Sequence, residues 1–401
     1  MANNHNRRIF LNIAHPGGKE LDYVRKAFED DWIAPLGPNV DGFEDDLKRF
    51  LGGEKDVLAV SSGTAAVHLG LVGCGVGPGD EVIAQTFTFC ASVNPIVYLG
   101  AKPILVDSEK DTWNMDPDLL EEAINDRISK TGRTPKAIVP VSLYGMPYKV
   151  DRILEIANKY GIPVIEDSAE ALGSRFNGKA LGTFGRFGVL SFNGNKMITT
   201  SGGGALICPD PKTKAKMLHY ATQAREPFPY YQHENLGYNY RLSNVCAGIG
   251  RGQMLVADEH IQHHRKVAML YADLLKDIPG IQVHDNPTPN IESNFWLSTI
   301  VLNPELRVRG QEASSKGETS CEPNPNVMAL IRQLDLAGIE TRPLWKPMHK
   351  QPLYQDVPYY CGSNPVSEDL FRAGLCLPSG PRVSEENIRL ISETIRASVL
   401  A

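Results

Sequence analysis

The chain has 401 residues, of which 42% are hydrophobic and 22% are charged. This composition is typical of a globular protein, and the length suits one large domain and a smaller one. The net charge of −6 gives no reason to expect a nucleic acid or an acidic membrane as a partner. No apolar run is long enough to span a bilayer, and residues 1–8 lack the apolar core of a signal peptide. We therefore expect a cytoplasmic protein.

The cysteines and histidines do not form a recognisable metal motif. The seven cysteines include no Cys-x-x-Cys pair and mostly lie in apolar surroundings, which favours reduced packing thiols over disulfides or zinc ligands. His263 and His264, with His260 nearby, could suggest a metal site. No cysteine or carboxylate spacing completes such a site, so we expect histidines on the surface of a helix and no metal.

The first predicted elements are a loose strand and two helices. The strand covers 9–14, and a helix over 20–30 follows with its apolar residues on one face. A stiff loop rich in proline and glycine covers 31–38. It carries Trp32, an aromatic side chain that either covers a site or packs against the body of the protein. A second amphipathic helix is expected from about 40 to 50.

From residue 57 to about residue 209, predicted strands alternate with predicted helices. The strands are expected at 57–60, 81–85, 103–107, 137–141, 162–166, 188–192 and 204–208. Helices are expected between several of them, including 117–125 and 150–160. This alternation predicts an α/β fold with a mostly parallel sheet and helices on both of its faces.

Loops at the ends of two predicted strands carry candidate ligand-binding groups. Ser62, Gly63 and Thr64 follow the first strand and open a helix, where free N–H groups and small hydroxyls bind phosphate. As a bare capping motif this pattern is common. Phe89 follows the second strand and could stack on a planar cofactor, although most phenylalanines pack in a core.

Asp167 and Lys196 lie at the ends of two further strands, where ligands bind in open α/β sheets. An aspartate in this place can keep the pyridine nitrogen of pyridoxal phosphate protonated, and a helix N-cap is the alternative. Lys196 follows an Asn-Gly-Asn turn in a segment without other charges. A partly buried amine of this kind can form a Schiff base with a carbonyl; the alternative is a lysine at the edge of a hairpin.

A long helix over about 243–277, with a possible break, leads into a smaller α+β unit. In this unit we expect a strand at 295–302 and helices at 327–337 and from 384 onward. The polar stretch 303–326 is rich in Pro, Gly and Ser, and we interpret it as an insertion or a mobile loop. The predicted division is a large domain over 1–265 and a small domain over 266–401.

In combination and order, these motifs resemble the DegT-type pyridoxal-phosphate nucleotide-sugar aminotransferases over nearly the whole chain. The resemblance is carried by 61–66, 87–89, 166–173, 191–196 and 237–241. Glu170 and the segments 193–196, 222–226 and 342–349 look most like the UDP-N-acetylbacillosamine transaminase branch. The resemblance implies the aspartate-aminotransferase-like architecture, fold type I, with pyridoxal 5′-phosphate (PLP) bound to the large domain.

The resemblance also implies a reaction. L-glutamate would aminate the C4 ketone of a UDP-4-keto-6-deoxy-N-acetylhexosamine, giving a UDP-4-amino-4,6-dideoxy-N-acetylhexosamine for a surface glycan or glycoprotein. An aminotransferase of the perosamine type, acting on GDP-4-keto-6-deoxymannose, is one alternative. A non-catalytic scaffold or regulator is another, and the intact Lys196 and Asp167 oppose it. The configuration of the product at C4 remains open.

Two further enzyme classes are disfavoured. A sugar 3-dehydratase on the same scaffold carries histidine where this chain has Lys196. A dinucleotide-dependent oxidoreductase would need a G-x-G-x-x-G motif after an early strand, and the sequence has none there.

The resemblance implies roles for residues around the cofactor. Lys196 would carry the Schiff base and move protons, and Asp167 would pair with the ring nitrogen. Glu170 would approach the ring hydroxyl, and Phe89 would stack on the ring. The phosphate would be held by Ser62, Gly63, Thr64 and Ser191. Relatives commonly have histidine where this chain has Ser142, which is one departure from the pattern.

The remaining implied roles concern the substrate and a second subunit. Asn239, with Arg241 as a further candidate, would reach the phosphate bound by the neighbouring subunit, so the active unit would be a homodimer. Trp32, Arg225 and His349 are weaker candidates for contacts to the sugar, the uracil or the diphosphate.

Overall fold

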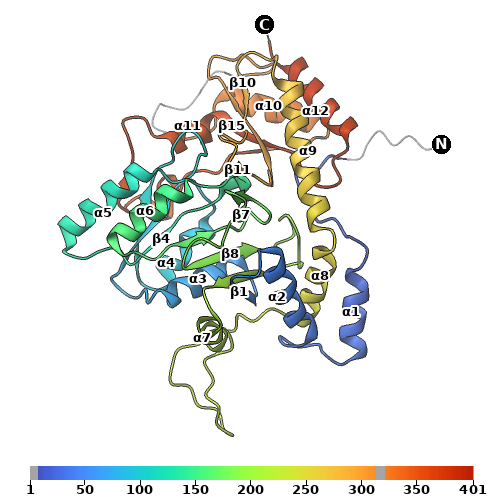
Figure 1. The fold of residues 1–401 in the computed structure, drawn as a ribbon. Helices are drawn as coiled ribbons and strands as arrows, with labels where there is room; N and C mark the ends of the chain where they lie inside the picture. The colour runs from blue at the N-terminus through green and yellow to red at the C-terminus, as the bar shows by residue number, and fades with distance from the viewer. Residues whose placement is uncertain (1–7, 313–320, 401) are drawn as a thin grey trace.

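The computed structural model describes residues 8–312 and 321–400. Its centre is a sheet made of two adjoining halves (Figure 1). One half has the order β1 (Asp56–Val60), β9 (Gly204–Cys208), β8 (Phe187–Ser191) and β5 (Ile165–Asp167). The other has the order β14 (Tyr359–Tyr360), β3 (Lys102–Val106), β2 (Glu81–Gln85) and β4 (Ala137–Val139). Parallel bridges from Ile138 to Val164 and from Val141 to Asp167 join the halves.

The sheet is mostly parallel, as predicted. Only β9 runs antiparallel to its neighbours β1 and β8, and the pairs β5–β8, β2–β4 and β2–β3 are parallel. All seven predicted strands are present, with ends shifted by a few residues. The eighth strand, β14, comes from the C-terminal part of the chain and pairs with β3.

Both faces of the sheet are buried, which explains why its strands are continuous apolar runs. Val57 and Ala59 of β1 pack with Phe43 and Leu47 of α2 (Pro38–Phe50) on one face. Leu58 of β1 points the other way, into the cluster formed with α3 (Gly63–Gly73). Buried helices on both faces are the usual arrangement around a parallel sheet.

The four helices predicted at 20–30, 40–50, 117–125 and 150–160 lie close to their predicted positions, whereas two further helices and three short strands were not predicted. The helices are α1 (Glu20–Glu29), α2 (Pro38–Phe50), α4 (Asn94–Tyr98), α5 (Pro117–Thr131), α6 (Val150–Tyr160) and α7 (Pro211–Ala221). The short strands β6 (Arg175–Phe176), β7 (Lys179–Ala180) and β11 (Ile291–Glu292) form a separate small sheet. Helix α5 is longer than expected because it continues to Gly132, whose φ of 68° ends it in the left-handed conformation.

The expected long helix is two helices, α8 (Asn244–Met254) and α9 (Ala257–Leu275), which form a bent column along one side of the molecule (Figure 1). A second sheet follows, in the order β10 (Ile281–Val283), β12 (Ser298–Leu302), β15 (Gly374–Leu377) and β13 (Arg342–Pro343). It packs with α10 (Pro325–Leu336), α11 (Val366–Ala373) and α12 (Glu385–Ser398). The predicted boundary at residue 265 falls inside α9, so the division into two domains stays a prediction.

Three expectations need correction. The strand predicted at 295–302 begins only at Ser298, because Phe295 has a φ of +49°. The strand predicted at 9–14 is not formed; its place is taken by a single parallel β-bridge between Ile9 and Ile339 of the C-terminal part of the chain. Part of the predicted insertion, 313–320, lies outside the described residues, and α10 begins inside its last residues.

The sequence predicts that His260, His263 and His264 lie on the surface of a helix, and this prediction is wrong for two of them. His264 is completely buried and His260 nearly so. Burial lowers the pKa of His264 to about 3, so the imidazole is neutral. Within 8–312 and 321–400, no group of three His, Cys, Asp or Glu side chains is placed to hold a metal ion. In the same residues, no helix combines the length and the apolar character needed to cross a membrane.

Candidate active site

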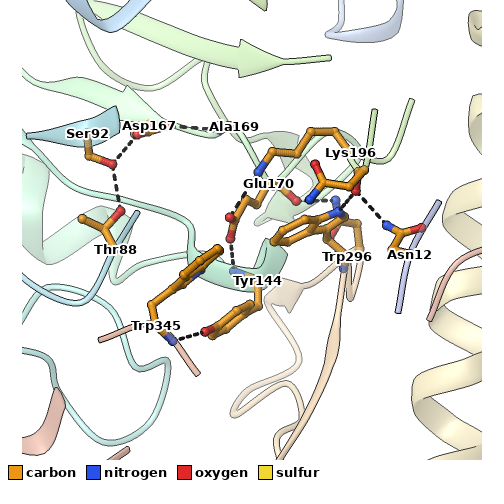
Figure 2. Close-up of polar contacts among 12 residues, drawn as sticks. Asn12, Thr88, Ser92, Tyr144, Asp167, Ala169, Glu170, Lys196, Trp296 and Trp345 are labelled. Atoms are coloured by element: carbon orange, nitrogen blue, oxygen red, sulfur yellow. Dashed lines mark hydrogen bonds and ion pairs between the residues drawn. The ribbon is translucent and has the colours of Figure 1, made fainter. Parts of the chain in front are cut away.

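Asp167 and Lys196 lie at one cavity of about 340 Å³. Asp167 ends β5, and Lys196 follows the turn after β8, and these two strands are parallel neighbours. Their carboxyl ends therefore meet at the same edge of the sheet. Figure 2 shows the two side chains with the aromatic residues around them.

The Asp167 carboxylate is buried and is held by two donors. Ser92 Oγ donates to Oδ2 at 2.6 Å, and the Ala169 N–H donates to Oδ1 at 3.2 Å. Ser92 is itself linked to Thr88 by a 2.8 Å hydroxyl contact (Figure 2). Burial raises the pKa of Asp167, while Ser92, Ala169 and the charge of Lys196 oppose this rise. A cationic partner inside the cavity would therefore stabilise the ionised carboxylate.

The Lys196 amine lies beside a second buried carboxylate. Its Nζ is 3.2 Å from Glu170 Oε1 and 4.1 Å from the ring centroid of Trp296. Glu170 Oε2 accepts a 2.7 Å hydrogen bond from the N–H of Tyr144, whose φ is +55°. Burial raises the pKa of Glu170, and the charge of Lys196 opposes the rise. The amine is thus held close to a group that can share its proton.

The start of α3 supplies an anion site at the same cavity. Ser62 caps the helix by accepting the N–H of Ala65 at 3.0 Å. A Cβ on Gly63 would lie 3.0 Å from the Cβ of Ser191, a tight contact, so the glycine lets the Ser191 side chain approach the start of the helix closely. Thr64 also lines the cavity. Free N–H groups, the helix dipole and three hydroxyls make this a good fit for a phosphate.

Phe89 and Trp345 form an aromatic wall of the cavity. Their ring centroids are 5.2 Å apart with an angle of 51° between the planes. Phe89 is 50% exposed, so it is not in a core and its ring is accessible to a planar ligand. Together with Asp167, Lys196 and the start of α3, this wall encloses a space whose donor set fits PLP.

Several predicted cofactor and substrate residues lie elsewhere. The described residues that line the cavity do not include Arg225, Asn239, Arg241 or His349. His349 is buried, bonded to Thr86 Oγ1 at 2.8 Å and to Glu368, so its ring nitrogens are already used. Its ring therefore links the loop after β2 to α11, and its assignment as a substrate contact stays a prediction.

Arg241 is also engaged within the chain, with the Glu44 carboxylate and the carbonyl of Ala59. Both contacts are made by Nη1, and the assignment of Arg241 as a substrate or phosphate contact stays a prediction. Arg225 lies over the ring of Tyr231, in the segment 222–240 that extends away from the body beyond α7 (Figure 1). Trp32 is partly exposed, and its carbonyl accepts a 2.9 Å hydrogen bond from Asn244.

The cavity is also lined by Ser92, Trp296 and Trp345, which were not selected from the sequence. Tyr144, whose N–H donates to Glu170, was not selected either. Ser92 lies in the loop that the sequence had marked after the second strand, so its hydroxyl was a detectable signal. Trp296 and Trp345 come from the C-terminal region, and no local pattern ties them to strand ends that are more than a hundred residues away.

Comparisons with known proteins agree with this geometry. Residues 16–396 match the model of the DegT/DnrJ/EryC1/StrS aminotransferase family. The chain belongs to this family. This aminotransferase is 42% identical to a protein of Bacillus subtilis (strain 168) described as the putative pyridoxal phosphate-dependent aminotransferase EpsN, over 97% of this chain and 95% of that protein.

Two further relatives extend the likeness. GDP-perosamine synthase of Escherichia coli O157:H7 is 36% identical over 94% of this chain and 95% of that protein. The crystal structure of a DegT DnrJ EryC1 StrS aminotransferase from Brucella abortus superposes with a TM-score of 0.84 at 28% identity, over 94% of this chain and 95% of that one. The expected fold type I and the sugar aminotransferase class are confirmed, and PLP is the cofactor of this family.

Proposed function

We propose that this aminotransferase moves the amino group of L-glutamate to the C4 ketone of a UDP-2-acetamido-2,6-dideoxy-4-keto-hexose, with PLP as cofactor. The observation that supports the chemistry is the meeting of Lys196, Asp167 and the start of α3 at one cavity. An amine, a buried carboxylate and an anion site are the three groups that PLP requires.

Each group has a defined task in this proposal. When bound, PLP supplies a carbonyl for the Lys196 amine and a ring that accepts electrons. Asp167 holds the ring nitrogen in its charged form, and Ser92 keeps the carboxylate oriented. The start of α3, with Ser62, Thr64 and Ser191, holds the phosphate. Lys196 carries protons at the reacting carbon, and Glu170, 3.2 Å away, receives or returns them.

The nucleotide is the less constrained part of the proposal. The UDP assignment rests on the resemblance of Glu170 and of segments 193–196, 222–226 and 342–349 to one branch of the family. The relative named GDP-perosamine synthase favours a GDP-4-keto-6-deoxymannose as the second candidate. The two substrates share the C4 ketone and the missing oxygen at C6, so the same catalytic groups serve both.

Product analysis distinguishes these candidates. The purified protein is incubated with PLP, L-glutamate and either the UDP- or the GDP-4-keto sugar, and the product is examined by NMR. We expect a 4-amino-4,6-dideoxy UDP-sugar and one molecule of 2-oxoglutarate per molecule of product. Preferred turnover of the GDP-sugar would overturn the UDP assignment and keep the aminotransferase, whereas no amine in either product would contradict the reaction at C4.

We further propose that the working unit is a homodimer with shared active sites. The segment 222–240 extends from the body (Figure 1), and its side chains Phe228, Tyr230, Tyr231 and Leu236 are exposed. Exposed large apolar side chains that gather on a protruding segment are typical of an interface. In this arrangement Asn239 would reach the phosphate in the partner's cavity.

A further inference from the structure

Trp296 connects the C-terminal region with the amine of Lys196. The residue lies two positions before the start of β12 and is almost completely buried. Lys196 Nζ lies 4.1 Å from its ring centroid while Glu170 Oε1 lies 3.2 Å from the same nitrogen. Figure 2 shows the indole and the carboxylate both reaching the end of the lysine side chain. The amine therefore has an aromatic partner and an acidic partner, both desolvated.

The same indole also holds the backbone from which Lys196 projects. Trp296 Nε1 donates a 2.7 Å hydrogen bond to the carbonyl of Asn195, the residue before Lys196. Asn12 Nδ2 donates a second one to this carbonyl at 2.9 Å (Figure 2). A carbonyl oxygen accepts two hydrogen bonds, so the acceptor is fully used. The peptide that carries the lysine is thus fixed from two distant segments.

Asn294 ties the position of Trp296 to that of Glu170. The N–H of Trp296 donates to Asn294 Oδ1 at 2.9 Å. Asn294 Nδ2 donates to the carbonyls of Glu170 and Leu172, each at 2.9 Å. One buried amide therefore sets the spacing between the indole and the carboxylate that face the amine.

We propose that Trp296 is a positioning residue for Lys196. Its ring face keeps the free amine beside Glu170, and its indole N–H fixes the direction in which the lysine side chain starts. This role would matter once the Lys196 amine is free. The amine would then take the proton from the α carbon of glutamate and return it to the second carbon, to which the transferred nitrogen would stay bonded. A ring face attracts a cation without fixing one direction, so the amine can swing between the two carbons. The proposal rests on the assignment of Lys196 made above.

The test compares two substitutions with a matched control. Trp296→Leu removes both the ring face and the N–H, whereas Trp296→Phe keeps a ring and removes the N–H. Trp113→Phe is the control, because Trp113 is also buried but stacks on His284 and does not line this cavity. For Trp296→Leu we expect the single-turnover rate with glutamate to fall about ten-fold. For Trp296→Phe we expect a fall of about three-fold. The control should keep the parent rate.

Two readouts separate positioning from a general structural effect. With α-deuterated glutamate, the isotope effect should rise in Trp296→Leu, because proton transfer by a less well-held amine becomes more rate-limiting. In protein without cofactor, reductive methylation with ¹³C-formaldehyde labels the lysine amines, and the signal of Lys196 is the one that is missing in Lys196→Ala. Its methyl signal should show an upfield ring-current shift that disappears in Trp296→Leu. If that variant does not fold, Trp296→Phe and the parent provide the same comparison at smaller amplitude.

Lys196→Ala, rescued with methylamine, completes the design. In that background Trp296→Leu should cause no further loss, because the amine that the indole holds is gone. Two results would overturn the role of Trp296 alone. One is an equal loss of rate from Trp296→Leu in the parent and in Lys196→Ala; the other is unchanged kinetics in Trp296→Leu together with no ring-current shift in the parent. Full activity of Lys196→Ala without added amine would overturn the lysine assignment itself, and the present proposal with it.

Discussion

Lys196 and Asp167 are the residues on which the proposed chemistry depends. Lys196→Ala should abolish turnover, because among the described residues that line the cavity only Lys196 carries an amine. The visible absorbance band of cofactor attached to the lysine should disappear as well. Absorption spectra before and after glutamate, together with product assays, measure both effects. Lys179→Ala, at an exposed lysine paired with Glu54, is a suitable control and should behave like the parent. Aminotransfer by Lys196→Ala would refute the assignment.

Ser92 sets how readily Asp167 stays ionised. Its hydroxyl donates to the carboxylate at 2.6 Å and lowers the pKa that burial raises. Ser92→Ala should therefore raise the pKa of Asp167 further. Because Asp167 must be ionised to pair with a protonated ring nitrogen, a higher pKa moves the loss of activity on acidification to a higher pH. At neutral pH we expect a kcat lower by about ten-fold, from the loss of a hydrogen bond to a charged group.

The pH profile of kcat measures this effect, and Ser168→Ala is its control. Ser168 Oγ is buried one residue after Asp167, and within the described part of the chain it has no hydrogen-bond partner. Loss of that hydroxyl should leave the acidic limb in place. An unmoved acidic limb in Ser92→Ala would show that the hydroxyl does not govern the ionisation of Asp167.

At the scale of elements, the contact between β9 and the start of α3 shapes the phosphate site. Gly204 pairs with Val60 and with Ser191, and a Cβ on Gly204 would lie 2.4 Å from the nitrogen of Gly63. Such a contact is with backbone, so the helix start would have to move. Gly204→Ala should lower the free energy of unfolding by about 1–3 kcal/mol.

The same displacement should weaken the binding of PLP several-fold, because the N–H groups of α3 would no longer converge on the phosphate. Thermal unfolding and a fluorescence titration with PLP measure the two effects. Gly77→Ala is the control, since a Cβ there meets no atom within 4 Å. Unchanged PLP affinity in Gly204→Ala would argue against the start of α3 as the phosphate site.

At the scale of the whole molecule, shared active sites predict complementation between inactive variants. Asn239→Ala would remove a group supplied by one subunit, and Lys196→Ala a group supplied by the other. When the two variants are mixed and exchanged, hybrid dimers regain one intact site of two. A 1:1 mixture should therefore recover about a quarter of the parent activity. Sedimentation analysis confirms that the exchanged mixture is dimeric, and failure of that mixture to regain activity would contradict the shared site.

The sequence by itself determined the central sheet and the two principal groups of the site. The apolar runs that end at Asp167 and shortly before Lys196 are buried on both faces, and such runs are local patterns. Parallel strands have their carboxyl ends at the same edge of a sheet. Once Asp167 and Lys196 were assigned to the ends of such strands, the sequence therefore predicted that they lie close together. The capping serine of α3 was likewise visible in the sequence around it.

Only the tertiary structure decided which side chains surround the lysine and which of the candidates are free to bind. The indole of Trp296 contacts the carbonyl of Asn195 and the amine of Lys196, a hundred residues earlier in the chain, and no local pattern records that contact. The sequence offered Arg241 and His349 as ligand contacts. In the structure Arg241 pairs with Glu44, and His349 contacts Glu368. Burial and charge pairing depend on residues distant in the chain, which is why they could not be inferred from neighbours in sequence.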